Sequence, residues 1–328
     1  MISGLFYFLV RIVATRPVQY LLGSVLVTAG GVGLTWSGVA QFNGHFRELQ
    51  ANGLTGVVAF RYRLISPPSP WVLGEWFTLV LMTLPFAFAA AVFLWLIGRR
   101  KLAAVSLLPT SAIGAALALS CSRAVFWGAV LFFIGVFFVG VVYRVFPIRV
   151  AGVGTAGALC ALAALVFAEN AFHPGVLEAY VGGHTSQERS TEGRLVIWKR
   201  SLDVFKLAPV WGVGAGNAPL FLAASADEDQ TTGFASRTFS LPVQVLTEKG
   251  VVGAVLYLTV LVLAGWEAHR KLRHPKISPQ MKGLTCCLVA GIMAVLFREL
   301  TYSSLLEHAV TAMLFTMNLA LLAAEEPA

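Results

Sequence analysis

Residues 124–143 read AVFWGAVLFFIGVFFVGVVY and contain no charged side chain. A helix that crosses a bilayer needs about 20 predominantly apolar residues, so this stretch suffices for one span. The whole chain of 328 residues is 57% hydrophobic and 12% charged, whereas an ordinary soluble domain carries about 25% charged residues. This balance excludes a cytosolic globular enzyme, a disulfide-stapled secreted domain and a disordered chain. The apolar runs are continuous rather than alternating, which favours membrane helices over a β-barrel.

The same criterion finds eight candidate spans. They cover residues 18–38, 71–98, 102–120, 124–143, 147–168, 250–267, 283–298 and 306–324. The sequence therefore predicts an all-α, polytopic transmembrane helical bundle with about eight spans and one large, partly helical periplasmic loop. The expected parts are N-terminal transmembrane helices over 1–168 with an outer loop at 39–70, the large loop at 169–249, and C-terminal transmembrane helices over 250–328.

Lysine and arginine residues set the expected orientation of the spans. The connections that should share one side carry Arg11, Arg16, Arg99, Arg100, Lys101, Arg144, Arg149, Arg270, Lys271, Arg273, Lys276 and Lys282. Cytoplasmic loops are enriched in such residues, so this side and both termini are expected in the cytoplasm. Topology then accounts for the net charge of +8, and we expect no nucleic-acid partner.

The segment 169–249 contains no span and is long for an ordinary connection. Within it, Leu195, Trp198, Leu202 and Phe205 recur at helical spacing, which predicts an amphipathic helix lying on the membrane surface. Proline cannot continue a helix, so Pro209 is expected to end it. The large loop is therefore expected to be ordered in part.

Four arginines are expected at the outer surface, namely Arg123, Arg194, Arg237 and Arg298. Guanidinium groups stay charged and bind phosphates through two parallel hydrogen bonds, so these residues are candidates for an anion site. The alternative for each is an interfacial arginine whose head group extends to the lipid phosphates.

Glycines and acids supply the other candidates. The stretch from Trp211 to Asn217 reads WGVGAGN; without a preceding strand it predicts a tight turn rather than a nucleotide-binding loop. Glu248 is either an acid near a helix start or a site carboxylate. The histidines show no metal-binding spacing, so no metal and no cofactor are expected.

Taken together, these motifs resemble the bacterial O-antigen ligase and O-antigen polymerase superfamily. The resemblance rests on Ser122-Arg123, on Arg194-Leu195-Val196-Ile197-Trp198, on Pro209-Val210-Trp211-Gly212-Val213-Gly214-Ala215-Gly216-Asn217, and on Glu248-Lys249-Gly250-Val251-Val252-Gly253. It implies a membrane glycosyltransferase that moves a glycan from a polyprenyl pyrophosphate carrier to a hydroxyl acceptor on the periplasmic face. The implied partners are the carrier-linked glycan, membrane lipids, and an acceptor that is a glycan, a lipid or a protein.

The resemblance also implies roles for individual residues. Arg123 and Arg194 are expected to contact the pyrophosphate, and Arg298 and Arg237 join them by position and charge. The residues expected to shape the site are Ser122, Trp198, Gly212, Gly214, Gly216, Asn217 and Gly250. A pyrophosphate leaving group is a weak base, so charge neutralisation matters more than a strong general acid.

One departure from the family pattern affects the expected base. Members commonly carry His-Asn ahead of the Glu-x-Gly stretch, where this chain has Phe239 and Ser240. The remaining candidate bases are Glu248, His184 and Glu299, and a carboxylate must have its pKa raised to act well. The missing histidine favours a polymerase over a ligase.

Two other functions remain open. A transporter or flippase of lipid-linked or anionic substrates would use the arginines for binding alone, but it should carry ionisable residues or broken helices near the membrane midplane. An inactive family member could act as a scaffold. Members usually have ten or more spans, so this chain is expected to be either a compact or an incomplete member.

Overall fold

The computed structural model describes residues 17–51, 73–119, 122–172, 184–224, 238, 240–300 and 309–323. Within these residues the regular structure is entirely helical. The helices are α2 (Pro17–Ala51), α4 (Leu73–Leu96), α5 (Arg100–Leu119), α6 (Arg123–Val142), α7 (Ile148–Phe172), α9 (His184–Leu207), α10 (Ala218–Ala224), α11 (Leu241–Arg273), α12 (Pro279–Glu299) and α14 (Ala309–Ala323). The prediction of an all-α, polytopic helical protein is confirmed.

Six of the described helices are long and apolar enough to cross a membrane, and they are α4, α5, α6, α7, α11 and α12. The predicted span 18–38 corresponds to the shorter apolar stretch Leu21–Ser37 of α2. The predicted span 306–324 is described only from Ala309 to Ala323. Six of the eight expected spans therefore meet the criterion, and the other two correspond to shorter apolar helices.

Two boundaries differ from the expected ones. Helix α2 continues to Ala51, so residues 39–51 of the expected outer loop are helical. Helix α11 begins at Leu241 instead of residue 250, directly after Ser240 and with a proline in its first turn, a position that proline favours. Residues 52–70 of the expected outer loop lie outside the described part.

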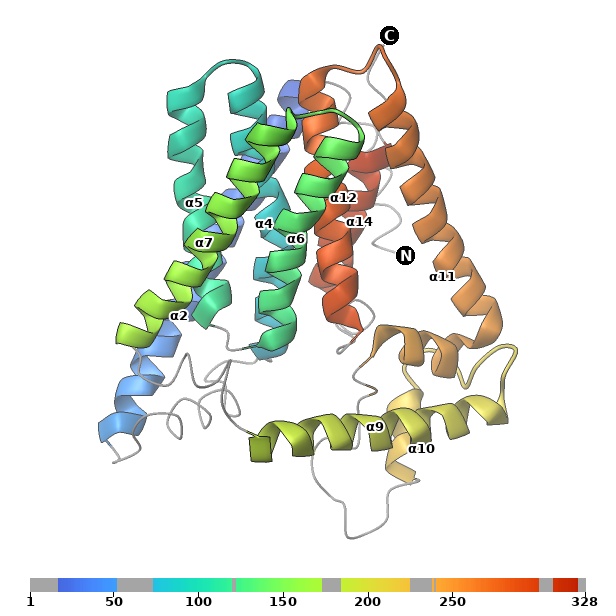
Figure 1. Cartoon of the computed structure of the whole chain (residues 1–328). Helices are drawn as coiled ribbons and strands as arrows, with labels where there is room; N and C mark the ends of the chain where they lie inside the picture. Colours follow the sequence, from blue (N-terminus) through green and yellow to red (C-terminus); the bar gives the residue numbers. More distant parts are fainter. Residues whose placement is uncertain are drawn as a thin grey trace.

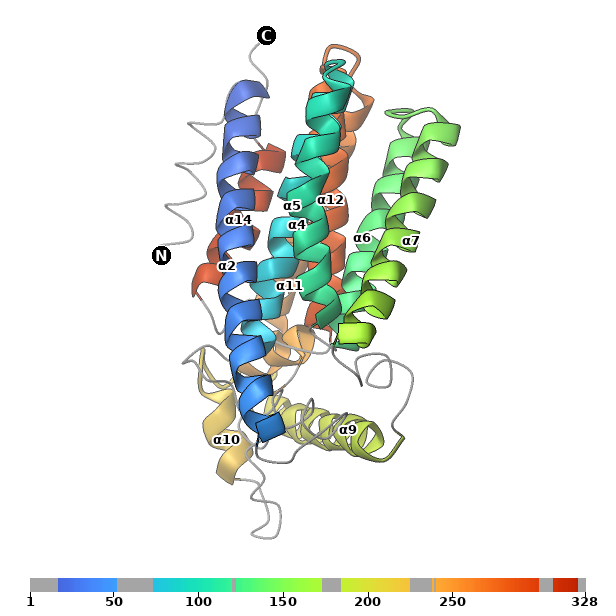
Figure 2. The same ribbon diagram turned by 90° about the vertical axis from the view of Figure 1, so that its left-hand side faces the viewer.

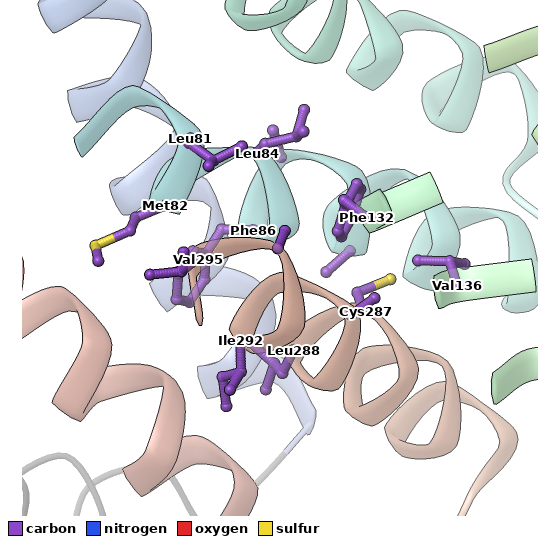
Figure 3. Close-up of a cluster of buried hydrophobic side chains, with 14 of the residues drawn as sticks. Leu81, Met82, Leu84, Phe86, Phe132, Val136, Cys287, Leu288, Ile292 and Val295 are labelled. Atoms are coloured by element: carbon purple, nitrogen blue, oxygen red, sulfur yellow. The ribbon is translucent and has the colours of Figure 1, made fainter. Parts of the chain in front are cut away.

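Helix α12 lies at the centre of the bundle and packs mainly on α4 and α6. Small residues bring these helices together: a Cβ atom on Gly291 would overlap the ring of Pro85 in α4, and one on Gly135 would lie 3.1 Å from Ala290. Figure 3 shows the apolar core between these helices, with Phe86, Phe132 and Val295 among its members. Close approach at small residues is the usual way in which membrane helices pack.

The two ends of the bundle differ. The short connections α4–α5, α6–α7 and α11–α12 lie together at the upper end in Figure 1, which we call the basic end because it carries exposed Arg99, Arg100, Lys101, Arg144, Arg149 and Lys276. At the opposite end α9 lies across the bundle, with α10 beside it (Figures 1 and 2). We call this the α9 end, and all the described candidate site residues lie there.

Candidate functional site at the α9 end

The predicted loop helix is present as α9, and it ends at Leu207, two residues before Pro209. The face that packs on the protein is not the predicted stripe. Leu195 and Leu202 are 49% and 43% exposed, whereas Ile197 and Val204 are buried with Leu222 of α10. Because α10 and the start of α11 cover this neighbouring face, Leu195 and Leu202 are left exposed, while Trp198 and Phe205 of the predicted stripe are half-buried.

Helix α11 is broken at Gly250, whose φ of 63° and ψ of −167° are not helical. In a regular helix the N–H groups of Val251 and Val252 would donate to the carbonyls of Thr247 and Glu248. The break separates these four groups, and each needs another partner because buried backbone groups are rarely left unpaired.

The segment that follows α9 supplies all four partners. The N–H groups of Val213 and Gly214 donate to the carbonyls of Thr247 and Glu248, both at 3.0 Å. The N–H groups of Val251 and Val252 donate to the carbonyls of Pro209 and Val210, at 2.9 and 3.2 Å. We call this exchange between residues 209–214 and 247–252 the glycine interlock. It joins two motifs that the sequence analysis considered separately.

Steric contact explains why the glycine interlock needs glycine on both sides. A Cβ atom on Gly212 would overlap the carbonyl of Glu248, and one on Gly250 would overlap the carbonyl of Val210 and lie 2.6 Å from the nitrogen of Gly212. Both residues also have positive φ, at 73° and 63°. A left-handed conformation and a bare backbone are both required, and glycine alone meets both conditions.

The rest of the turn leads into α10. Gly214 and Gly216 have φ values of 98° and 76°. Asn217 precedes α10, and its side-chain Nδ2 donates to the carbonyl of Val213 at 3.0 Å. A second link to α9 lies alongside, because the Thr247 hydroxyl donates to the carbonyl of Ser201 at 3.2 Å.

Glu248 lies within the glycine interlock. Its side chain is 3% exposed, and its Oε1 accepts a hydrogen bond from Nε2 of Gln244 at 3.1 Å. Gln244 is one helical turn earlier and is also buried. The sequence analysis did not single out Gln244, although its spacing of four residues from Glu248 on a helix was the available signal.

Arg123 and Arg194 differ in their surroundings. Arg123 is the first residue of α6 and is exposed, with Ser122 as the preceding cap residue. Arg194 is half-buried in α9, and burial lowers the pKa of its guanidinium from its ordinary value. An arginine nevertheless stays charged in proteins. One turn further along α9, the Trp198 indole N–H is buried and has no hydrogen-bond partner within the described part of the chain.

Residues 108–258 match a family model described as O-antigen ligase. This stretch of the chain is similar to the O-antigen ligase family, and we call it the O-antigen ligase domain. It includes Arg123, Arg194, Glu248 and both sides of the glycine interlock, so the resemblance expected from the motifs is confirmed. A comparison with curated proteins found no match. The match supports a membrane glycosyltransferase of the O-antigen ligase and polymerase type.

Two candidate residues lie C-terminal to the matched O-antigen ligase segment. Arg298 and Glu299 end α12, are 3% and 0% exposed, and form an ion pair in which Arg298 Nη1 lies 3.1 Å from Glu299 Oε1. Half-buried Tyr257 of α11 lies near enough to interact electrostatically with Glu299. The described contacts connect neither Arg123 nor Arg194 to this pair.

The remaining candidate residues of the O-antigen ligase domain are less fully described. Arg237 and Phe239 lie outside the described residues, and His184 is the first residue of α9 but its side chain is outside the described part. Among the described residues, no group of three or more His, Cys, Asp or Glu side chains is placed to hold a metal ion.

Proposed function

We propose that the protein is a polymerase-type glycosyltransferase that moves a glycan from a polyprenyl pyrophosphate carrier to the hydroxyl of an acceptor glycan. The reaction takes place at the α9 end, which we propose faces the periplasm. The glycine interlock is the observation that carries this proposal, because it fixes α9, and with it Arg194, against the turn of α11 that bears Glu248. Both residues lie in the O-antigen ligase domain.

Arg123 and Arg194 are the proposed ligands of the pyrophosphate. Arg123 is exposed at the start of α6, where a guanidinium can reach a lipid phosphate, and Arg194 is held half-buried in α9. The Trp198 indole N–H, a buried donor without a partner in the described part of the chain, lies on the same side of α9 one turn away. Arginine forks and N–H donors together match the acceptor oxygens of a pyrophosphate. We assign Arg237 to the same anion site on the grounds of charge.

The proposed reaction is a substitution at the anomeric carbon of the carrier-linked sugar. The acceptor oxygen forms the new bond to this carbon as the bond to the pyrophosphate oxygen breaks, and the bonding electron pair leaves with the pyrophosphate. Arg123 and Arg194 stabilise the charge that develops there. The hydroxyl proton passes to a base, for which we propose Glu248 ahead of His184 and Glu299.

Glu248 is favoured because of its position. It lies in the O-antigen ligase domain, and Gln244 orients one of its oxygens. Arg298 and Glu299 are as buried as Glu248, but they also form an ion pair with each other, so a substrate would have to displace this pair to reach either side chain. We therefore propose that this pair supports the end of α12 beneath the site instead of contacting the substrate.

A reconstitution tests the proposal. The purified full-length chain in detergent is mixed with a polyprenyl-pyrophosphate-linked repeat unit, and the products are separated by length while released carrier pyrophosphate is measured. We expect a ladder of longer glycans with one carrier released for each bond formed. If no ladder forms but an added lipid or protein acceptor is glycosylated, the polymerase assignment is wrong and a ligase remains. Carrier binding without any transfer would contradict catalysis altogether.

A further inference from the structure

A cavity lies between helices α4, α5, α6 and α7, away from the α9 end. The cavity has a volume of about 550 Å³, within the range of about 300–1,000 Å³ that is usual for small-molecule sites. Its walls are almost entirely apolar, with Phe88, Phe133 and Leu107 among them. None of the residues proposed for glycan transfer lines it.

Small residues of α7 create much of this space. Gly154 and Gly157 both line the cavity, and a Cβ atom added to either would meet no atom within 4 Å. Both glycines are exposed, so the cavity is open to the surroundings of the bundle on this side. Four membrane-spanning helices form the walls, so the molecules that surround this cavity in place are lipids.

The cavity reaches the basic end of the bundle. Trp95 and Arg100, on either side of the α4–α5 turn, line it together with Phe146 of the α6–α7 connection. The Arg100 side chain is exposed and therefore available to a ligand, and exposed Arg99, Lys101 and Arg149 lie in the same connections. An apolar cavity with cations at one end is complementary to an amphiphile with an anionic head and a hydrocarbon chain.

We propose that this cavity binds one anionic phospholipid, whose acyl chain fills the space beside Gly154 and Gly157 and whose phosphate is held by Arg100. The occupant belongs to the membrane leaflet at the basic end, opposite the proposed glycan-transfer site. The proposal therefore does not depend on the proposed function. It assigns a lipid partner to the helix pairs α4–α5 and α6–α7. The bound acyl chain would contact both pairs.

Native mass spectrometry of the full-length chain tests this inference. The protein is delipidated in detergent and incubated with phosphatidylglycerol or phosphatidylcholine carrying the same acyl chains, and the lipid-bound fraction is measured. We expect phosphatidylglycerol to be retained at least about ten-fold better, because the choline of phosphatidylcholine would bring a positive charge beside Arg99, Arg100 and Lys101, whereas phosphatidylglycerol has a net negative charge. Arg100→Gln should lower retention of phosphatidylglycerol by a similar factor, and Gly157→Leu should remove binding of both lipids.

Gly265→Leu is the matched control, because Gly265 lies in α11 outside the cavity and also has open space around it. It should bind phosphatidylglycerol like the parent chain. Thermal unfolding identifies any variant that does not fold, and Gly154→Leu then replaces Gly157→Leu. Equal retention of the two lipids by the parent chain and by Arg100→Gln would overturn the headgroup assignment. Undiminished lipid binding by folded Gly157→Leu would overturn the cavity assignment. So would a lipid-free dimer of the parent chain that the Gly157→Leu substitution disrupts.

Discussion

Gly212 and Gly250 pack backbone against backbone, so closely that a methyl group on either would overlap the main chain of the other's motif. Four hydrogen bonds surround this contact and replace the two that the break in α11 removes. The end of α9 and the entry into α11 are therefore one unit. Disturbing either glycine should affect both elements.

Gly212→Ala and Gly250→Ala should each destabilise the protein by about 2 kcal/mol or more, since each adds left-handed strain of about 1–3 kcal/mol to a steric overlap. Thermal unfolding in detergent measures the loss. Gly193→Ala in α9 is the control, because its Cβ atom would meet nothing within 4 Å and alanine is the better helix former. Variants of Gly212 or Gly250 as stable as the parent chain would contradict the described packing.

Arg194→Ala and Arg123→Ala should each abolish glycan transfer without loss of folding, because the leaving pyrophosphate would lose a charged ligand. The rate of glycan transfer by Arg194→Lys should also fall at least about ten-fold, since an ammonium cannot form the two parallel hydrogen bonds of a guanidinium to the pyrophosphate. Lys199→Ala removes an exposed cation from the same helix and should retain activity. The measurement is the rate of carrier pyrophosphate release. Activity in both alanine variants equal to that of the parent would refute the anion site.

Glu248→Gln should reduce turnover by a factor of about 10²–10⁴, the range that general-base catalysis contributes. The amide keeps the shape of the side chain, so folding and donor binding should persist. Glu267→Gln changes an acid at the basic end, where Glu267 pairs with Arg270, and serves as the control. If Glu248→Gln turns over normally, the base lies elsewhere, and the same measurement on His184→Ala and Glu299→Gln would follow.

The Arg298–Glu299 pair predicts a double-mutant cycle. Removing one member of a buried ion pair leaves an uncompensated charge and typically costs about 3–5 kcal/mol. Arg298→Met and Glu299→Leu should therefore each lower the thermal unfolding temperature strongly, while the double variant should recover most of the loss. A double variant as unstable as the sum of the two single variants would show that the two residues act independently.

The proposed orientation predicts which side of the membrane each end occupies. A cysteine at Lys199 in α9 should react with an impermeant maleimide added from the periplasm, and one at Lys276 at the basic end should not. The chain's own cysteines are first replaced by serine. The reverse labelling pattern would place the site in the cytoplasm and refute the proposed reaction.

Long, uncharged runs such as 124–143 predicted the membrane helices well, because crossing a bilayer imposes a length and an apolarity that few other structures need. The loop helix and its end near Pro209 were also predictable from local spacing. These features depend only on neighbours in the sequence.

What the sequence did not reveal depends on distant neighbours. Nothing at Gly212 indicates that the backbone packed against it is the turn at Gly250. The sequence analysis placed the apolar face of α9 at the stripe that includes Leu195 and Leu202. The face that packs on the protein is the one that contacts Leu222, which belongs to another helix.

The glycine interlock uses main-chain atoms for all four of its bonds, so it does not depend on the side chains of Val210, Val213 or Val251. The outward face of α9 could therefore change while Ile197 and Val204 keep their packing on Leu222 and the helix keeps its position. A helix with a different outward face, grafted between residues 184 and 207, should occupy the same position as the original. New acceptor preferences could thus be engineered on α9 without redesigning the bundle beneath it.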